Sequence, residues 1–285
     1  MTINSKRKEF KITKGLWKGY TLWNLFSKAQ TPYAWHKKIF DYAKKINILC
    51  FSSAFDKSSI ELLEKLNCPI YKIASFEMNY LPLIKKVAKT KKPLIISTGL
   101  ASLNEIEETV KFAKKNGAKD ITLLYCVSNY PSKLKDFNLN NIEILRQKFN
   151  CEVGLSDHSL NNKVMMSAVA NGVKVIEKHI ALENQKKGYD IAFSLKGKQI
   201  KVFKNEMEEI NNLMGEYSFK RSKDEIKNLI FRRSIFAIKK IKKGEKLNKN
   251  NIRIVRPNIG LEPSKYFKII NKKSNKNYFV GDPIK

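Results

Sequence analysis

The chain has 285 residues, enough for one barrel-sized domain or two smaller ones. It contains no apolar run of membrane-spanning length and no apolar signal core near Met1, so we expect a cytoplasmic protein without a membrane partner. The formal net charge is +30, but the basic residues are mostly lysines spread along the whole chain, which favours anionic substrates over nucleic acid.

Short apolar runs alternate with amphipathic segments over the first two-thirds of the chain. The apolar runs predict six strands, at 48–53, 70–75, 94–98, 121–126, 153–156 and 173–178. The segments between them predict helices at 35–45, 57–66, 80–89, 102–116, 140–149 and 161–171. Repeated strand-helix units predict a parallel sheet, and six in series favour a TIM (β/α)8-type barrel over an open doubly wound sheet.

Local signals mark the ends of several predicted helices. Ser102 and Glu105 have the spacing of a capping box, in which each side chain satisfies a backbone amide of the other residue. Gly117 and Gly172 stand where helices should end.

A closed barrel needs eight strands in about 250 residues, hence roughly 30 residues for each unit. The six units found here predict that the first two strands, about 60 residues at the same spacing, are absent. Such a partial barrel would leave two sheet edges open, which favours aggregation.

A different pattern follows the strand-helix repeats. A helix after Lys204 is expected to run to about Tyr217, and a charged stretch at 219–230 is predicted to be a linker. The remainder alternates β-type runs with turns and predicts a small β-rich domain. The expected organisation is a partial barrel at 1–218, a linker at 219–230 and a second domain at 231–285.

Two of the three histidines, His158 and His179, each close a predicted strand. The carboxyl ends of barrel strands form the active-site face, so both imidazoles should meet at one mouth. Imidazole is a good ligand for divalent transition metals, and Asp157 and Glu177 could supply supporting or acid/base chemistry. The alternative is that both are structural histidines with satisfied hydrogen bonds. His36, at a loop-to-helix junction, is ambiguous.

Five stretches of the first region resemble the sialic-acid synthase family: FSSAFD (51–56), YKIASFE (71–77), KPLIISTG (92–99), GLSDH (154–158) and EKH (177–179). The second domain resembles the family's antifreeze-like (SAF) module through RRSIF (232–236), KGE (243–245) and VRP (255–257). Three further stretches make the chain most similar to the pseudaminic acid branch: GLWKG (15–19), TPYAWH (31–36) and DIAFSL (190–195).

The resemblance implies a metal-dependent condensation of phosphoenolpyruvate with an amino-sugar aldehyde, giving a nine-carbon 2-keto acid and phosphate. For the pseudaminic branch the aldehyde is 2,4-diacetamido-2,4,6-trideoxy-L-altrose, and the product serves surface glycans or flagellin glycosylation. The implied metal is Mn2+, with Co2+ or Mg2+ as alternatives. A domain-swapped homodimer is also implied.

The resemblance assigns roles to individual residues. His158 and His179 match the metal ligands, Asp190 matches an acid near the acceptor's hydroxyls, and Tyr130 falls in the substrate loop. Glu77 is expected at the mouth as a hydrogen-bond partner or proton carrier, and Glu77, Asp190 and Tyr130 are the predicted catalytic residues. The matching phosphoenolpyruvate-binding positions are Lys72, Ser75, Lys92, Ser97, Ser128 and Ser156. Arg256 matches an arginine that reaches into a neighbouring subunit's site.

Other functions remain open from the sequence. An N-acetylneuraminate or legionaminate synthase would share every one of these motifs. In the family the first barrel strand carries an active-site glutamate, and its expected absence here leaves an inactive, truncated remnant or a binding protein as a further alternative. A nucleic-acid binder rests on the net charge alone.

Overall fold

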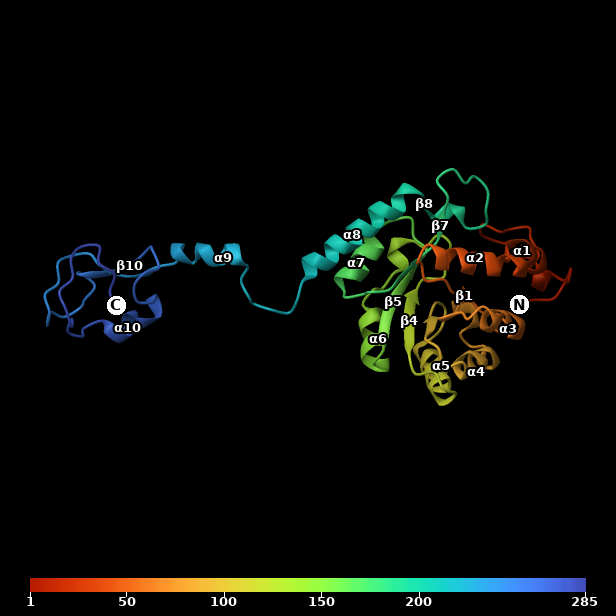
Figure 1. The fold of residues 1–285 in the computed structure, drawn as a ribbon, viewed down its shortest axis with the longest axis horizontal. Helices are drawn as coiled ribbons and strands as arrows, with labels where there is room; N and C mark the ends of the chain where they lie inside the picture. The colour runs from red at the N-terminus through yellow and green to blue at the C-terminus, as the bar shows by residue number, and fades with distance from the viewer. The chain divides into compact units, whose positions relative to one another are not determined.

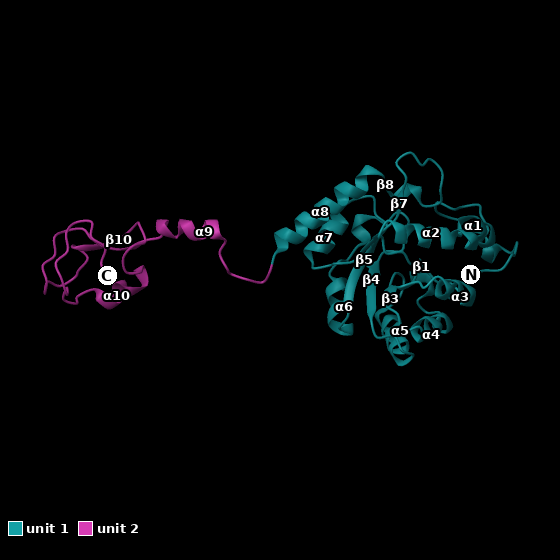
Figure 2. Ribbon diagram, in the orientation of Figure 1, with its two compact units in different colours: residues 1–215 teal, residues 216–285 magenta.

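A computed structural model describes all of residues 1–285 and divides them into two compact units, Met1–Gly215 and Glu216–Lys285 (Figure 2). The predicted linker 219–230 contains a short helix, α9 (Lys223–Lys227), which belongs to the second unit. No helix is both long and apolar enough to cross a membrane.

The first unit is built on six parallel strands that follow one another in the sheet in chain order. They are β1 (Ser52–Ser53), β2 (Tyr71–Ile73), β3 (Leu94–Ser97), β4 (Ile121–Cys126), β5 (Glu152–Asp157) and β6 (Ile176–Lys178). The sheet curls into half a barrel (Figure 1). The strand order makes β1 and β6 its two edges. The prediction of six βα units and a partial TIM-type barrel is confirmed.

Helices connect the strands and cover the sheet (Figure 1). They are α2 (Tyr33–Lys45), α3 (Lys57–Lys65), α4 (Leu81–Lys89), α5 (Leu103–Lys115), α6 (Asn141–Phe149), α7 (Lys163–Ala170) and α8 (Lys198–Met214). Their apolar faces and the strands form a single core that includes Ile73, Leu123 and Met165, each fully buried. Burial of this apolar surface drives the association of helices with the sheet.

Local signals act as the sequence predicts. Ser102 caps α5 and forms a capping box with Glu105. Gly117 and Gly172 follow their helices with φ of 113° and 80°, a left-handed conformation that glycine adopts without strain. The predicted strand at 48–53 is reduced to two paired residues, because Ile48 and Leu49 are exposed beyond the sheet.

Several elements were not predicted. Helix α1 (Leu22–Ala29) precedes α2, and a two-stranded parallel sheet joins β7 (Ile180–Ala181) to β8 (Leu195–Lys196). The last helix of the first unit, α8, begins at Lys198, six residues before the expected start at Lys204.

The second unit has its own small core. Strands β9 (Ser234–Ala237) and β10 (Ile252–Val255) pair antiparallel, and helix α10 (Tyr266–Ile269) follows them in the chain. Ile235, Ile241 and Ile252 are fully buried in a cluster separate from that of the first unit. This is a β-rich module of the kind that the sequence predicts.

Candidate active site

The carboxyl ends of the parallel strands bring together most of the predicted site residues, as the barrel geometry requires. Lys72 on β2 is the central cation. Its Nζ donates hydrogen bonds to Ser97 Oγ at 2.6 Å and to the Ile73 carbonyl at 3.2 Å, and it lies 3.5 Å from Glu177 Oε2. Only 6% of the Lys72 side chain is exposed, so neighbouring protein groups and not water stabilise its charge.

Glu177 on β6 contacts both Lys72 of β2 and Ser156 of β5. Ser156 Oγ donates to Glu177 Oε1 at 2.6 Å, and the two residues are register partners of β5 and β6. The sequence suggested Glu177 as a supporting group but did not predict its contacts with Lys72 and Ser156. The alternation of side chains along a strand was the available signal, because it places Glu177 on the same face as His179.

His158 and His179 lie side by side at this mouth, with ring centroids 5.4 Å apart. His158 Nδ1 donates to the Val127 carbonyl at 3.3 Å, since a carbonyl can only accept. His179 Nδ1 lies 3.5 Å from Asp190 Oδ2. These contacts leave the Nε2 atom of each ring without a protein partner.

Burial lowers the pKa of His158 below its usual 6.5, and the neighbouring His179 lowers it further. A neutral imidazole keeps the lone pair that a metal requires. Phe193 is buried against both rings, at 6.2 Å from His158 and 4.9 Å from His179 between centroids.

Tyr130 packs against His158, with the two ring centroids 4.3 Å apart. Burial raises the pKa of its phenol to about 12, and nearby acidic groups, Glu177 and Asp190 among them, add to the rise. The phenol therefore stays protonated at neutral pH and can act as a hydrogen-bond donor.

Glu77 follows β2 in a short 3-10 helix, Ser75–Glu77. Its Oε2 is buried without a hydrogen-bond partner. Burial raises the pKa of this carboxyl, although the Lys72 charge partly opposes the rise. An unpaired carboxyl with a raised pKa is suited to accept or donate a proton.

Two of the predicted hydroxyl groups, Ser75 and Ser128, meet at Gly99. Ser75 Oγ lies 3.1 Å from Cys126 Sγ, and the Gly99 amide donates to the same sulfur at 3.2 Å. A Cβ at Gly99 would collide with both Ser75 and Ser128, so only glycine leaves this cradle open. Small hydroxyl groups clustered at a glycine, where no side chain blocks a ligand from reaching the backbone, are typical of anion-binding sites.

A cavity of about 420 Å3 lies next to this cradle, between the ends of β3 and β4 and helices α5 and α6. It shares Gly99 and Ser128 with the cradle, but neither histidine lines it. Lys72, Glu77 and Glu177 do not line it either, so the cavity adjoins the site through Gly99 and Ser128.

The structure does not bring Lys92 to the mouth, and the expectation that it lies there is corrected. Lys92 precedes β3, so it lies at the opposite, amino edge of the sheet, where its Nζ donates to Glu64 at 2.7 Å. Arg256 is exposed in the second unit, directly after β10. His36 is a buried residue of α2 whose Nδ1 bonds to the Pro32 carbonyl at 3.2 Å, which gives it a structural role.

The side chains present fit a divalent cation in part. Each histidine has its Nδ1 beside an oxygen and its Nε2 without a protein partner, an arrangement found in most protein metal sites that use histidine. No group of three or more His, Cys, Asp or Glu side chains is arranged as a complete metal site. A metal held by His158 and His179 would therefore need further ligands from substrate or water.

Comparison with known proteins agrees with this geometry. The NeuB family matches residues 1–219, and the SAF domain matches residues 232–285. The pseudaminic acid synthase of Campylobacter jejuni is 40% identical over the whole chain, which covers 83% of that protein, and the Helicobacter pylori pseudaminic acid synthase is 41% identical. An N,N'-diacetyllegionaminic acid synthase of Campylobacter jejuni is 41% identical over 88% of the chain and 76% of its own length.

Solved structures show the same fold. A putative spore coat polysaccharide biosynthesis protein of Chromobacterium violaceum superposes with a TM-score of 0.78 at 25% identity, over 92% of this chain and 79% of that one. The N-acetylneuraminic acid synthetase of Leptospira borgpetersenii, solved with citrate, has a TM-score of 0.68 at 31% identity over 72% of each chain. The chain belongs to the NeuB family of sialic-acid synthases and carries that family's SAF domain.

Proposed function

We propose that this chain is a phosphoenolpyruvate-dependent nonulosonate synthase that makes pseudaminic acid from 2,4-diacetamido-2,4,6-trideoxy-L-altrose. The main observation behind this proposal is the buried Lys72. It is hydrogen-bonded to Ser97, lies next to Glu177 and is in the same barrel mouth as the histidine pair. The similarity to pseudaminic acid synthases over the entire chain supports the choice of acceptor.

In the proposed reaction, carbon 3 of phosphoenolpyruvate forms a bond to the aldehyde carbon, and the aldehyde oxygen takes up a proton. Water adds to carbon 2, and phosphate leaves from the same carbon, so that a 2-keto acid remains. Lys72 would neutralise the anionic substrate, with Ser75, Ser97, Ser128 and Ser156 as hydroxyl donors.

The remaining side chains would act on the acceptor and on protons. Glu77, buried and unpaired, would carry a proton, Asp190 would bind acceptor hydroxyls, and Tyr130 would donate from its neutral phenol. His158 and His179 would hold the divalent metal on which sialic-acid synthases generally depend, here Mn2+, with Co2+ or Mg2+ as alternatives. The metal would supply Lewis-acid polarisation of the aldehyde.

We also propose a homodimer in which Arg256 of one subunit binds an acetamido group in the site of the other. The support for this arrangement is that Arg256 is an exposed cation on a module with its own core. Arg256→Ala should then raise the acceptor KM and leave the phosphoenolpyruvate KM unchanged.

The test is phosphate release from phosphoenolpyruvate with Mn2+ and each of three acceptors: the altrose, the legionaminate precursor and N-acetylmannosamine. The full chain is assayed alone and with a two-unit βαβα polypeptide supplied separately, because the sheet has two open edges. Release with the altrose in either condition supports the proposal. Phosphate release only with another acceptor would instead identify the synthase that uses that acceptor. No phosphate release in any mixture would favour the binding protein or the remnant.

Two variants connect any turnover to the site. Lys72→Met should lower phosphate release about 100-fold or more, the effect of losing ~3 kcal/mol of transition-state stabilisation. Lys148→Met removes a cation that joins α6 to Glu107 on α5, at 2.6 Å, away from the mouth. It should leave the rate within about twofold.

A further inference from the structure

A second ion pair lies directly behind the histidines. Lys178 Nζ donates to Asp157 Oδ2 at 2.7 Å and also to the Ser159 carbonyl. Asp157 Oδ1 accepts from the Ser159 amide at 2.9 Å, and its Oδ2 accepts from the Ser159 hydroxyl at 3.1 Å. The side chain of Asp157 is fully buried and that of Lys178 is 6% exposed, so the pair is a closed network within the protein.

The position of this pair in the strands is informative. Asp157 and Lys178 are register partners of β5 and β6, and each immediately precedes one histidine of the site. Side chains of a strand alternate between its faces, so Ser156 and His158 share one face of β5 and Glu177 and His179 share one face of β6. The ion pair occupies the opposite face at the same height.

Few residues pair strand β5 with strand β6. Three register pairs connect them, Leu155 to Ile176, Ser156 to Glu177 and Asp157 to Lys178, and β6 is an edge strand of three residues. A slip of one residue would turn every side chain of β6 to the other face and remove His179 from the site. Because so few residues pair β5 with the edge strand β6, a specific side-chain contact is needed to fix the register of the two strands.

We propose that the Asp157–Lys178 pair is that contact, and that its role is to position His158 and His179 as a pair for a divalent cation. This inference rests on the metal role given to the two histidines in the proposed function. Buried ion pairs contribute little net stability compared with apolar replacements, but a buried charge without its partner is strongly unfavourable. Any register that separates Asp157 from Lys178 is therefore penalised, and the observed one is selected.

The chain offers a clean probe because it contains only three histidines. In protein labelled with 15N-histidine, each ring gives its own nitrogen resonances, and His36, buried in α2 of the same unit, is an internal reference. Lys178→Met should shift or broaden the ring resonances of His158 and His179 and leave those of His36 unchanged. The matched control, Lys148→Met, should leave all three rings unchanged.

The same samples are then titrated with Mn2+, which broadens nearby resonances because it is paramagnetic. Lys178→Met should raise the Mn2+ concentration needed for half-maximal broadening of His158 and His179 by about tenfold or more, as expected when an outer group that orients metal ligands is lost. If Lys178→Met fails to fold because Asp157 is then buried alone, the double variant Asp157→Asn with Lys178→Met, which removes both charges, is measured in its place.

A folded variant with unchanged His158 and His179 resonances and unchanged Mn2+ dependence would overturn the inference alone. Unchanged Mn2+ binding in His158→Ala and His179→Ala proteins would overturn the metal role in the proposed function, and the positioning role with it. The two failures are therefore distinguished by which variants retain Mn2+ binding.

Discussion

Among residues, Lys72 shows how burial selects one side chain from many of the same type. The chain has 56 lysines and arginines, and most are exposed surface charges. Lys72 differs because it is 4% exposed and is held by Ser97 from the next strand and by Glu177 from the far edge of the sheet. A buried cation with polar partners at a barrel mouth is a functional candidate on physical grounds.

Glu77 gives a pH-dependent prediction. Its pKa is raised in the folded protein by burial, so the folded state binds the proton more strongly than the unfolded chain, whose value is near 4.5. As pH rises above 4.5 and through the folded pKa, the ionised carboxyl destabilises the fold. Glu77→Gln should therefore raise the unfolding temperature at pH 7, because the neutral amide removes the cost of burying an ionised carboxyl.

The measurement is thermal unfolding of both proteins at several pH values. The difference should disappear below pH 4, where the carboxyl is protonated in both states. A gain in stability that is the same at pH 4 and pH 7 would contradict the assignment of a raised pKa. At pH 7 the variant should also lose activity, because a glutamine amide neither accepts nor releases a proton as an acid or base near neutral pH.

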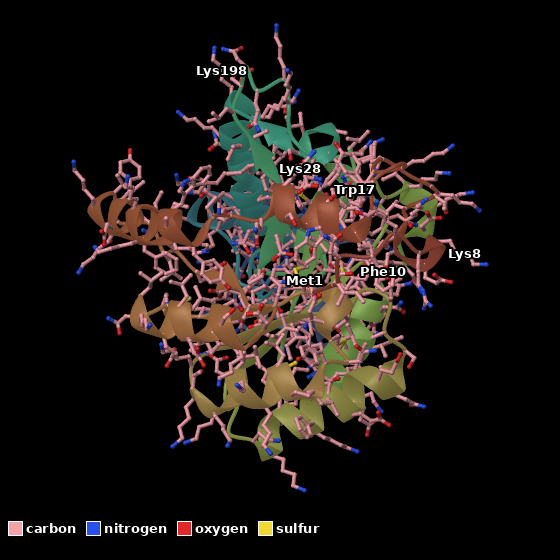
Figure 3. The ribbon with its side chains drawn as sticks, turned by 90° about the vertical axis from the view of Figure 1, so that its right-hand side faces the viewer. Met1, Lys8, Phe10, Trp17, Lys28 and Lys198 are labelled. Carbon is pink, nitrogen blue, oxygen red and sulfur yellow. The ribbon has the colours of Figure 1, made fainter.

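Among elements, the N-terminal segment contributes to the site from far away in the sequence. Residues 11–21 form a hairpin in which the Ile12 amide donates to the Tyr20 carbonyl at 2.9 Å, and Lys28 of α1 lies 5.7 Å from the Tyr20 ring. Figure 3 shows Trp17 and Lys28 on the same face of the first unit. The Trp17 indole donates to the Tyr189 carbonyl at 3.2 Å and its ring lies 5.8 Å from that of Tyr130.

Trp17→Ala should loosen both Tyr130 and the loop that carries Asp190, because their shared support is removed. We expect the KM for the sugar to rise about five- to tenfold, the effect of ~1 kcal/mol for one lost hydrogen bond. In the proposed reaction the protonated Tyr130 phenol and Asp190 act on the acceptor sugar. The phosphoenolpyruvate KM should therefore change less than the sugar KM. Trp35→Ala, in which an exposed tryptophan of α2 is removed, is the control, and equal effects of the two variants would contradict this role.

At the scale of the whole molecule, the open sheet of the first unit has a physical cost. Strands β1 and β6 each have an unpaired edge, and the chain before β1 exposes Ile48 and Leu49 at 60% and 63%. On helix α2, Trp35, Ile39 and Tyr42 are also exposed. Unpaired edges beside apolar surface favour association with other chains.

The double variant Ile48→Lys with Leu49→Lys should therefore reduce self-association, because charges beside an edge strand oppose pairing with another chain. Sedimentation velocity over a range of protein concentrations measures the effect. The double variant Leu160→Lys with Leu213→Lys, at two exposed leucines before α7 and in α8, adds the same charge and is the control. An equal decrease in the control would show that net charge, and not the β1 edge, governs association.

The sequence alone determined the strand-helix alternation, the parallel sheet, the helix caps at Ser102 and the placement of both histidines at strand ends. These features depend on local periodicity and on side chains a few residues apart, which a single sequence contains. Only the tertiary structure decided that Lys92 pairs with Glu64, that Glu177 joins Lys72 to Ser156, and that Trp17 reaches Tyr189. Those contacts join residues between 21 and 172 positions apart, and they depend on which edge of the sheet a residue occupies and on how the chain closes around the core.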